Sequence, residues 1–187
     1  IRDKARFEVA RIEEIEREVQ HDVIAFVSAV AENVGPEGRW LHYGLTSSDV
    51  LDTALGVTLK EAGGLLLERV IGLFEAVAAR AVEHRDTPMV GRSHGIWAEP
   101  TTFGLKLANW AFELQRDRQR LSRARDAVAV GKISGAVGTY AHTPPAIEAF
   151  VCDRLGIGID CRREFEGDCT EGVTEGLGAL DFAERNA

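Results

Sequence analysis

The chain has 187 residues, and its 22 Lys and Arg against 30 Asp and Glu give a formal net charge of −8. A negative field repels nucleic acid and anionic membranes, so this composition argues against a general binder of either. Its 45% hydrophobic and 28% charged content is typical of one globular domain, and no apolar run approaches the roughly 18 residues of a membrane span. We therefore expect a cytoplasmic protein, and the lack of a starting Met makes the chain a possible fragment.

The first predicted helix carries apolar residues at steps of three and four, which places them on one helical face: Ile12, Ile15, Val19, Val23, Phe26 and Val30. It ends at the turn-forming sequence Gly35–Gly38. A second, long helix is predicted from the capping sequence Thr46-Ser47-Ser48-Asp49 to Ala81. Gly63-Gly64 inside it predicts a bend or a close crossing with another helix.

The third predicted helix begins at Pro100, a residue suited to a first helical turn, and its apolar stripe reaches Val128. A glycine-rich loop, Gly131–Gly138, and a short helix up to Leu155 follow. Alternating β-type runs are nearly absent, so the sequence predicts an all-α fold, a bundle of long helices. We expect this helical region to span residues 1–155 and an acidic, Gly-rich tail to occupy 156–187.

The histidines fall mostly in the polar connections between the predicted helices: His42, His84, His94 and His142. His21 is placed inside the first predicted helix and is followed directly by Asp22. Because helix ends converge in a long-helix bundle, His42 and His94 could line one cleft, with helix N-terminal N–H groups available to an anion. The pattern therefore favours a small anionic substrate.

Several motifs point to other chemistry but lack its context. Gly91-Arg92-Ser93-His94-Gly95 matches the G-x-S-x-G elbow of serine hydrolases, which needs a strand in front and a helix directly behind. The flanking Pro88 and Pro100 argue against that arrangement. Gly131-Lys132 lacks the Ser or Thr that follows the lysine of a P-loop. No metal-binding motif is found, so we expect no metal and no cofactor. The three cysteines, Cys152, Cys161 and Cys169, form no CxxC pair, so we expect no disulfide framework.

Four stretches together resemble the adenylosuccinate lyases of the fumarase/aspartase superfamily. They are QHDVIAFV from Gln20, HYGLTSSDVLDTA from His42, GRSHGIWAEPTTFGLK from Gly91 and GKISGAVG from Gly131. The TSSDVLDTA segment alone would also suit argininosuccinate lyase or a carboxymuconate cycloisomerase, whereas HGIWAEPTTFG is similar to the adenylosuccinate branch. The resemblance implies the superfamily's long-helix bundle and a homotetramer whose active sites draw on several subunits.

The resemblance also implies a reaction, the β-elimination of fumarate from adenylosuccinate, giving AMP, and from SAICAR, giving AICAR, in purine biosynthesis. Such a reaction takes a proton from carbon, stabilises an aci-carboxylate and protonates the leaving nitrogen. By motif position His94 would be the general acid, and Ser93, where the family usually has Thr, would orient it. The substrate would be bound by a larger set: Gln20, His21, Asp22, Thr46, Ser47, Ser93 and, as a lesser candidate, His42.

Each binding residue also has a purely structural interpretation. Thr46 and Ser47 could only cap a helix, Asp22 could only complement a helix dipole, and His21 could be a surface residue. A further departure from the family is Trp97, which stands where a His is common.

The resemblance ends near Leu155. The family's Ser-Thr-Gln stretch, its loop Ser-Ser-x-Met-Pro-x-Lys-x-Asn with the usual catalytic base, and its amino-terminal Arg-Tyr pair are not found in this sequence. We therefore expect part of a lyase that is inactive by itself. The alternatives are a non-catalytic helical scaffold or truncated lyase subunit, another lyase of the superfamily, and a serine hydrolase acting through Ser93.

Overall fold

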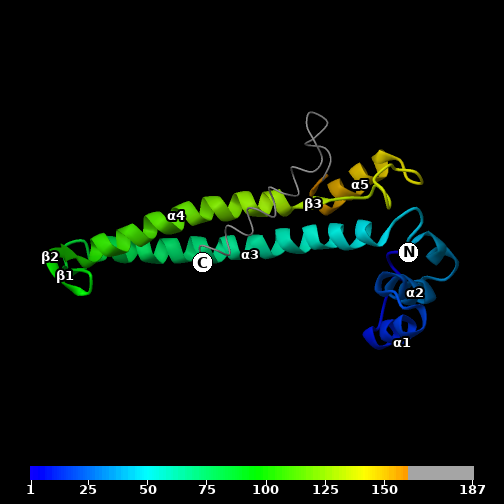
Figure 1. Ribbon diagram of the computed structural model, residues 1–187, viewed down its shortest axis with the longest axis horizontal. Coiled ribbons are helices and arrows are strands. Elements are labelled where there is room, and N and C mark those ends of the chain that lie inside the picture. The colour runs from blue at the N-terminus through cyan, green and yellow to red at the C-terminus, as the bar shows by residue number, and fades with distance from the viewer. Residues whose placement is uncertain (160–187) are drawn as a thin grey trace. The chain divides into compact units, whose positions relative to one another are not determined.

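A computed structural model describes residues 1–159, which belong to two compact units. One contains Ile1–Val57 and the segment that begins at Val130, and the other contains Thr58–Ala129. Five α-helices and one 3-10 helix account for most of the described residues: α1 (Val9–Val19), α2 (Asp22–Val34), η1 (Pro36–Trp40), α3 (Ser47–Glu83), α4 (Phe103–Val128) and α5 (Pro145–Leu155) (Figure 1). The expectation of a helical fold with long helices is confirmed.

The first predicted helix is in fact two, and this part of the prediction was wrong. Gln20 adopts a left-handed conformation with φ of 55° and ends α1, its N–H donating to the Glu16 carbonyl. His21 then becomes the N-cap of α2, with its side chain accepting a hydrogen bond from the Ile24 N–H. The apolar stripe continues across the break because α1 and α2 pack on each other through Ile12, Ile15, Ala25 and Ala29.

Helix α3 contains 37 residues and runs through Gly63-Gly64 without a break. A Cβ on Gly63 would lie 2.7 Å from Cγ of Arg125 in α4, so the predicted close helix crossing is present there. At the other end of the pair, Gly104 of α4 meets the backbone of Ala81 and Arg85. Within the Thr58–Ala129 unit, α3 and α4 therefore lie side by side and antiparallel (Figure 1).

A hairpin that the sequence analysis did not predict joins α3 to α4. Strand β1 (Pro88–Ser93) pairs antiparallel with β2 (Ile96–Thr102). Pro100 lies in β2 and does not begin a helix as predicted; a two-stranded sheet has only edge strands, where proline is tolerated. Thr102 is the N-cap of α4 instead, and its hydroxyl accepts the Leu105 N–H at 3.2 Å.

The second sheet lies in the other unit. Strand β3 (Val130–Gly131) pairs in parallel with β4 (Gly158–Ile159), which follows α5. The predicted loop and short helix are confirmed, and the predicted tail begins just before β4. Residues 160–187 of that tail, with Cys161 and Cys169, lie outside the described residues.

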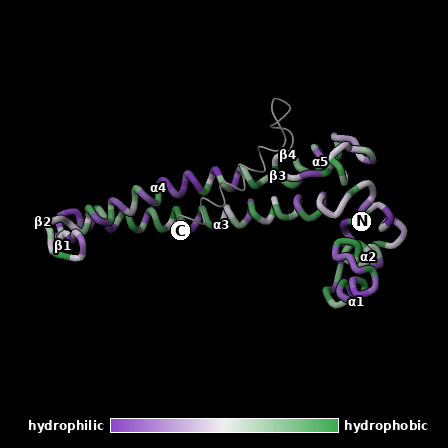
Figure 2. Tube along the Cα trace, viewed as in Figure 1, coloured by the Kyte–Doolittle hydropathy of each residue, from purple (hydrophilic) through white to green (hydrophobic). Residues whose placement is uncertain are grey.

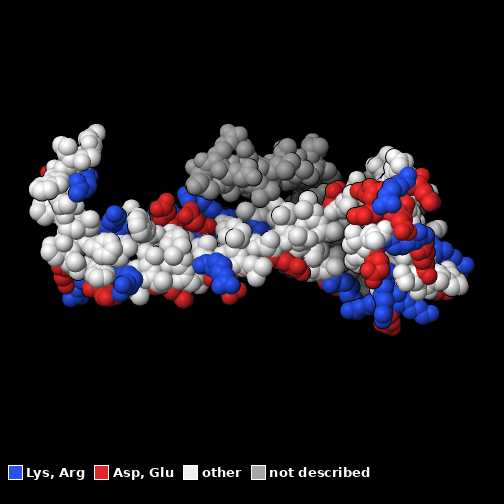
Figure 3. Space-filling model, turned by 90° about the horizontal axis from the view of Figure 1, so that it is seen from below, with Lys and Arg blue, Asp and Glu red and all other residues white. Residues whose placement is uncertain are grey.

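Apolar side chains remain exposed on the long helices. Figure 2 shows hydrophobic residues recurring along α3. Those on α3 are mostly leucines between 49% and 63% exposed: Leu51, Leu55, Leu65, Leu66 and Leu73. Acidic and basic side chains lie interspersed on the face drawn in Figure 3. Among the described residues, no helix is long and apolar enough to cross a membrane.

Candidate active site

The amino-terminal turn of α3 carries two of the predicted binding residues, Thr46 and Ser47. Asp49 holds this turn, because its Oδ2 accepts the Thr46 backbone N–H at 3.0 Å. This is the Asp half of the capping box that the sequence predicts, and it fixes where α3 begins. Among the described residues, the Thr46 hydroxyl makes no hydrogen bond, so its oxygen is not used to cap the helix.

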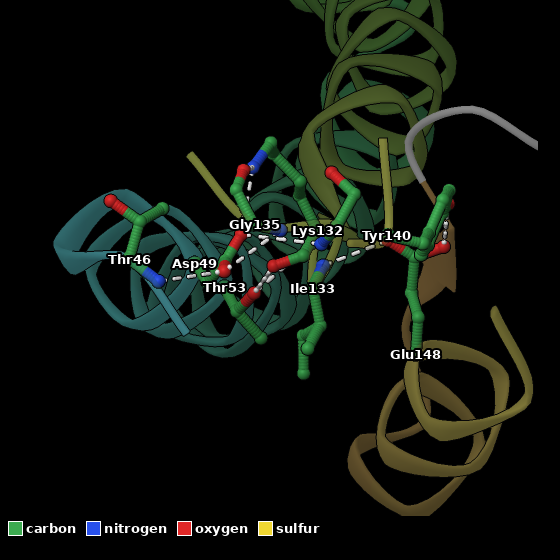
Figure 4. Close-up of polar contacts among 9 residues, drawn as sticks. Thr46, Asp49, Thr53, Lys132, Ile133, Gly135, Tyr140 and Glu148 are labelled. Carbon is green, nitrogen blue, oxygen red and sulfur yellow. Dashed lines mark hydrogen bonds and ion pairs between the residues drawn. The ribbon is translucent and has the colours of Figure 1, made fainter. Parts of the chain in front are cut away.

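Asp49 also anchors the glycine-rich loop, which comes from a distant part of the sequence (Figure 4). Its Oδ1 accepts hydrogen bonds from Lys132 Nζ at 2.7 Å and from the Ser134 N–H at 3.3 Å. Its Oδ2 accepts the Gly135 N–H at 3.1 Å. Together with the Thr46 amide, four donors surround a carboxylate whose residue is only 1% exposed.

These contacts lower the pKa of Asp49. Burial alone would raise this pKa, but the hydrogen bonds from Lys132 and from the Thr46 and Gly135 amides outweigh the burial and bring the pKa below its ordinary value of 3.8. The Lys132 ammonium, whose side chain is 26% exposed, also donates to the Gly135 carbonyl at 2.8 Å. The carboxylate and the ammonium thus form a largely buried ion pair at the base of the loop.

Four consecutive backbone amides of the loop donate hydrogen bonds to side chains. The Lys132 N–H donates to Thr53 Oγ1 at 3.1 Å, and the Thr53 hydroxyl donates back to the Lys132 carbonyl at 3.0 Å. The Ile133 N–H donates to Glu148 Oε1 at 2.8 Å, and the Ser134 and Gly135 amides bond to Asp49.

The far end of the loop is anchored by Glu148 on α5. Its Oε2 accepts the Tyr140 hydroxyl at 2.7 Å, and the Tyr140 N–H closes the loop on the Ser134 carbonyl at 3.0 Å. Gly131, the first residue of the loop, has no room for a side chain, since a Cβ there would lie 2.8 Å from Cδ1 of Ile157 and 3.0 Å from Sγ of Cys152. Cys152 is buried, and burial with the nearby Glu148 raises its thiol pKa.

The structure brings His21 and Ser47 together. His21 Nε2 lies 3.2 Å from Ser47 Oγ, and His21 Nδ1 lies 3.3 Å from Asp22 Oδ1. Neighbouring Gln20 donates its side-chain amide to the Arg17 carbonyl at 2.8 Å. The side chains of His21 and Asp22 are 44% and 67% exposed, so both are accessible to a ligand.

His42 lies in the same unit, between η1 and α3, and is half-buried. Among the described residues, its buried Nε2 has no hydrogen-bond partner. A buried ring nitrogen without a partner is costly, so a hydrogen bond to this atom would be favourable.

Ser93 and His94 belong to the Thr58–Ala129 unit, at the turn of the hairpin. Ser93 pairs with Ile96, and the two residues between them, His94 and Gly95, have positive φ angles of 52° and 79°. Two positive φ angles are what a type I′ hairpin turn requires, and glycine supplies the second without strain. His94 is exposed, and among the described residues its side chain makes no hydrogen bond. A strand and not a helix follows Ser93, so the hydrolase elbow is absent here.

Sequence reasoning missed the two carboxylates that anchor the loop behind this site. It placed Asp49 only in a helix cap and left Glu148 out. The T-x-x-D spacing was a usable signal for Asp49, but its pairing with Lys132 bridges 83 positions of sequence. No local pattern encodes such a contact.

Comparison with known proteins agrees with the four motifs. The family model described as lyase matches residues 2–173. The chain belongs to this lyase family. It is similar to the adenylosuccinate lyase of Bacillus subtilis (strain 168), with 50% identity over 157 residues, and to that of Synechocystis sp., with 56% identity over 157 residues. Each alignment covers 84% of this chain and 36% of the relative, so the chain spans about a third of the length of these curated relatives.

Solved structures show the same fold. The crystal structure of a fumarate lyase from Mesorhizobium sp. BNC1 matches with a TM-score of 0.76 and 29% identity, covering 92% of this chain and 42% of that one. A 3-carboxy-cis,cis-muconate lactonizing enzyme from Pseudomonas putida matches with a TM-score of 0.72 and 27% identity, covering 94% and 42%. The predicted resemblance and the predicted fold of this lyase chain are thereby confirmed.

Proposed function

We propose that this chain is part of an adenylosuccinate lyase, a carbon-nitrogen lyase that eliminates fumarate from adenylosuccinate and from SAICAR in purine biosynthesis. The observation that carries the proposal is the identity of 50% and 56% to two proteins of that name, in each case over 157 residues and 84% of this chain. No comparable support exists for the hydrolase alternative, because Ser93 is followed by a hairpin turn and a second strand.

The residues take the following roles in this proposal. His94, exposed at a two-residue turn, donates a proton to the leaving nitrogen, a task for which histidine is the side chain most often used. Ser93 orients His94. The substrate is bound by residues near the start of α2, before α3 and in the first turn of α3: Gln20, His21, Asp22, His42, Thr46 and Ser47. The contact of His21 with Ser47 supports a shared binding surface for two of them.

Assembly into a homotetramer in the cytoplasm is part of the same proposal. The leucines that α3 leaves exposed support association, because patches of more than a few hundred Å² rarely remain in water. Active sites drawing on several subunits would bring His94 of one copy to the binding residues of another.

The test is fumarate release from adenylosuccinate and from SAICAR, followed with the full-length protein that contains this chain. We expect turnover with both substrates and no labelling of Ser93 by a fluorophosphonate probe. A full-length protein that folds and binds neither substrate would favour the non-catalytic scaffold.

Residues 1–187 alone are expected to self-associate and to release no fumarate, because this sequence contains no Ser-Ser-x-Met-Pro-x-Lys loop to supply the base. Sedimentation and the same assay check this. A monodisperse monomer would remove the case for a shared bundle, and turnover by this piece would show that the base lies elsewhere.

A further inference from the structure

Asp49 is a buried carboxylate to which the motifs assign no role in binding or catalysis. Its residue is 1% exposed, and its two oxygens accept hydrogen bonds from four donors. One of these donors, the Thr46 amide, belongs to the turn that starts α3, and the other three belong to the glycine-rich loop more than 80 positions away. A single carboxylate thus joins the two segments (Figure 4).

We propose that Asp49 is a positioning residue for substrate binding. It fixes the Thr46-Ser47 turn against residues Lys132–Gly135 of the glycine-rich loop. This inference rests on the proposed function, in which Thr46 and Ser47 contact the substrate. Asp49 itself is too deeply buried to reach a ligand and acts through the backbone of Thr46.

The arrangement leaves the Thr46 hydroxyl available to a ligand. Asp49 takes the Thr46 amide, which secures the start of α3, while among the described residues the Thr46 hydroxyl has no hydrogen bond. The next residue, Ser47, meets His21 at 3.2 Å. A shift of the turn would therefore move both hydroxyls and the histidine contact together.

Lys132 makes the arrangement compatible with an anionic substrate. An unpaired carboxylate at N3 of α3 would repel a dicarboxylate or phosphate at the same helix end. The ammonium of Lys132 lies 2.7 Å from Asp49 Oδ1 and neutralises that charge, while its own bond to the Gly135 carbonyl keeps it in place. The pair fixes the turn without leaving net charge on it.

The first experiment is Asp49→Asn in the full-length protein, with KM and kcat measured for adenylosuccinate on the folded fraction. The Asn amide nitrogen cannot accept a bond, so the turn and the loop lose part of their common anchor. We expect KM to rise by about tenfold or more, with kcat on folded protein changed by less than about threefold. A purely structural role would reduce the amount of folded protein and leave KM unchanged, which would overturn the proposal.

Lys132 and Glu148 provide the matched variants. Lys132→Met should raise KM, because it leaves the Asp49 carboxylate unpaired beside the binding turn. Lys132→Arg keeps the positive charge, so its KM should stay within about threefold of that of the natural protein. Glu148→Gln disturbs the same loop but does not touch Thr46, so it should lower stability with KM within about twofold. An equal rise of KM in Glu148→Gln, or failure of both Asp49→Asn and Lys132→Met to fold, would contradict positioning and leave a structural role only.

Failure of this inference and failure of the proposed function are distinguishable. If the natural protein releases no fumarate from either substrate, the proposed function is wrong. If it is active and Asp49→Asn and Lys132→Met keep its KM, the function stands and the positioning role is wrong.

Discussion

The two segments to which we assign substrate binding and proton transfer are held in opposite ways. The turn before α3 is held by long-range polar contacts, with Asp49 receiving bonds from residues more than 80 positions away. The hairpin that carries His94 is held by local pairing of β1 with β2 and by the positive φ angles of two turn residues. In the proposed function, the buried anchor fixes the surface that binds substrate, whereas the exposed turn presents the group that donates a proton.

This contrast predicts that the two places respond differently to substitution. Changes at the hairpin turn should affect turnover more than stability, because His94 makes no hydrogen bond to the described residues. Substitution of Asp49 should affect stability and binding together, because this one buried side chain both anchors the loop and fixes the Thr46-Ser47 turn.

The largest effect is expected from His94→Gln in the full-length protein. Loss of the proposed general acid should lower kcat by about 10²-fold or more with little change in KM, because such a group acts in the transition state. His84→Gln is the control, since it makes the same substitution in the same unit, at a histidine bonded to Thr87 at 3.2 Å. Near-normal turnover of His94→Gln would refute its assignment as general acid.

The next effect is the stability of Asp49→Asn. Removing one partner of a buried ion pair costs about 3 to 5 kcal/mol, and because the Lys132 side chain is 26% exposed we expect the lower part of that range, about 3 kcal/mol. Denaturant midpoints of the variant and the natural protein measure it. The control is Asp153→Asn, the same substitution at an exposed residue of α5. It should change the free energy of unfolding by less than about 0.5 kcal/mol. Equal midpoints for Asp49→Asn would show that the pair is not a stabilising anchor.

Gly104→Ala tests the packing behind the hairpin. The new Cβ would overlap the backbone of Arg85 and Ala81, so we expect a loss of about 1 to 3 kcal/mol. Gly64→Ala is the matched comparison, because a Cβ there meets nothing within 4 Å among the described residues and alanine favours a helix by about 1 kcal/mol. The two alanines should therefore shift the thermal midpoint in opposite directions, and a shared sign would contradict the close contact at Gly104.

The smallest expected effect is a difference in pH dependence. The pKa of Asp49 is lower in the folded state than its ordinary 3.8, so the unfolded chain binds more protons, and the stability that Asp49 contributes is present above this pH. That contribution is lost as the pH falls from about 4 toward the folded pKa. The natural protein should thus lose stability more steeply below pH 4 than Asp49→Asn. Parallel stability curves would show that Asp49 titrates normally.

Much of this organisation could be predicted from the sequence. The apolar spacing indicated long helices, Thr46 to Asp49 marked the start of α3, and Gly63 marked the close crossing with α4. These features succeed because they are local: a periodic face, a cap and a glycine each act within a few residues.

The features that the sequence did not reveal depend on partners or on weak local signals. The break at Gln20 lies inside an unbroken apolar stripe, and a left-handed glutamine leaves no obvious mark in the sequence. The hairpin was concealed by Pro88 and Pro100 at its ends, which are typical of turns and helix starts as well as edge strands. The roles of Asp49 and Glu148 depend on tertiary contacts, with Lys132 and with Tyr140, that no local sequence pattern encodes.

The four loop amides that donate to side chains have a consequence for hydrogen exchange. Lys132, Ile133, Ser134 and Gly135 donate their N–H groups to Thr53, Glu148 and Asp49, so side chains protect backbone protons in this irregular segment. Exchange with deuterium must await local opening of the anchor that holds each amide. Asp49→Asn should speed exchange at Ser134 and Gly135 more than at Ile133, which Glu148 still holds. The exchange rate of each of these four amides therefore measures the opening of the one side chain to which that amide is bonded.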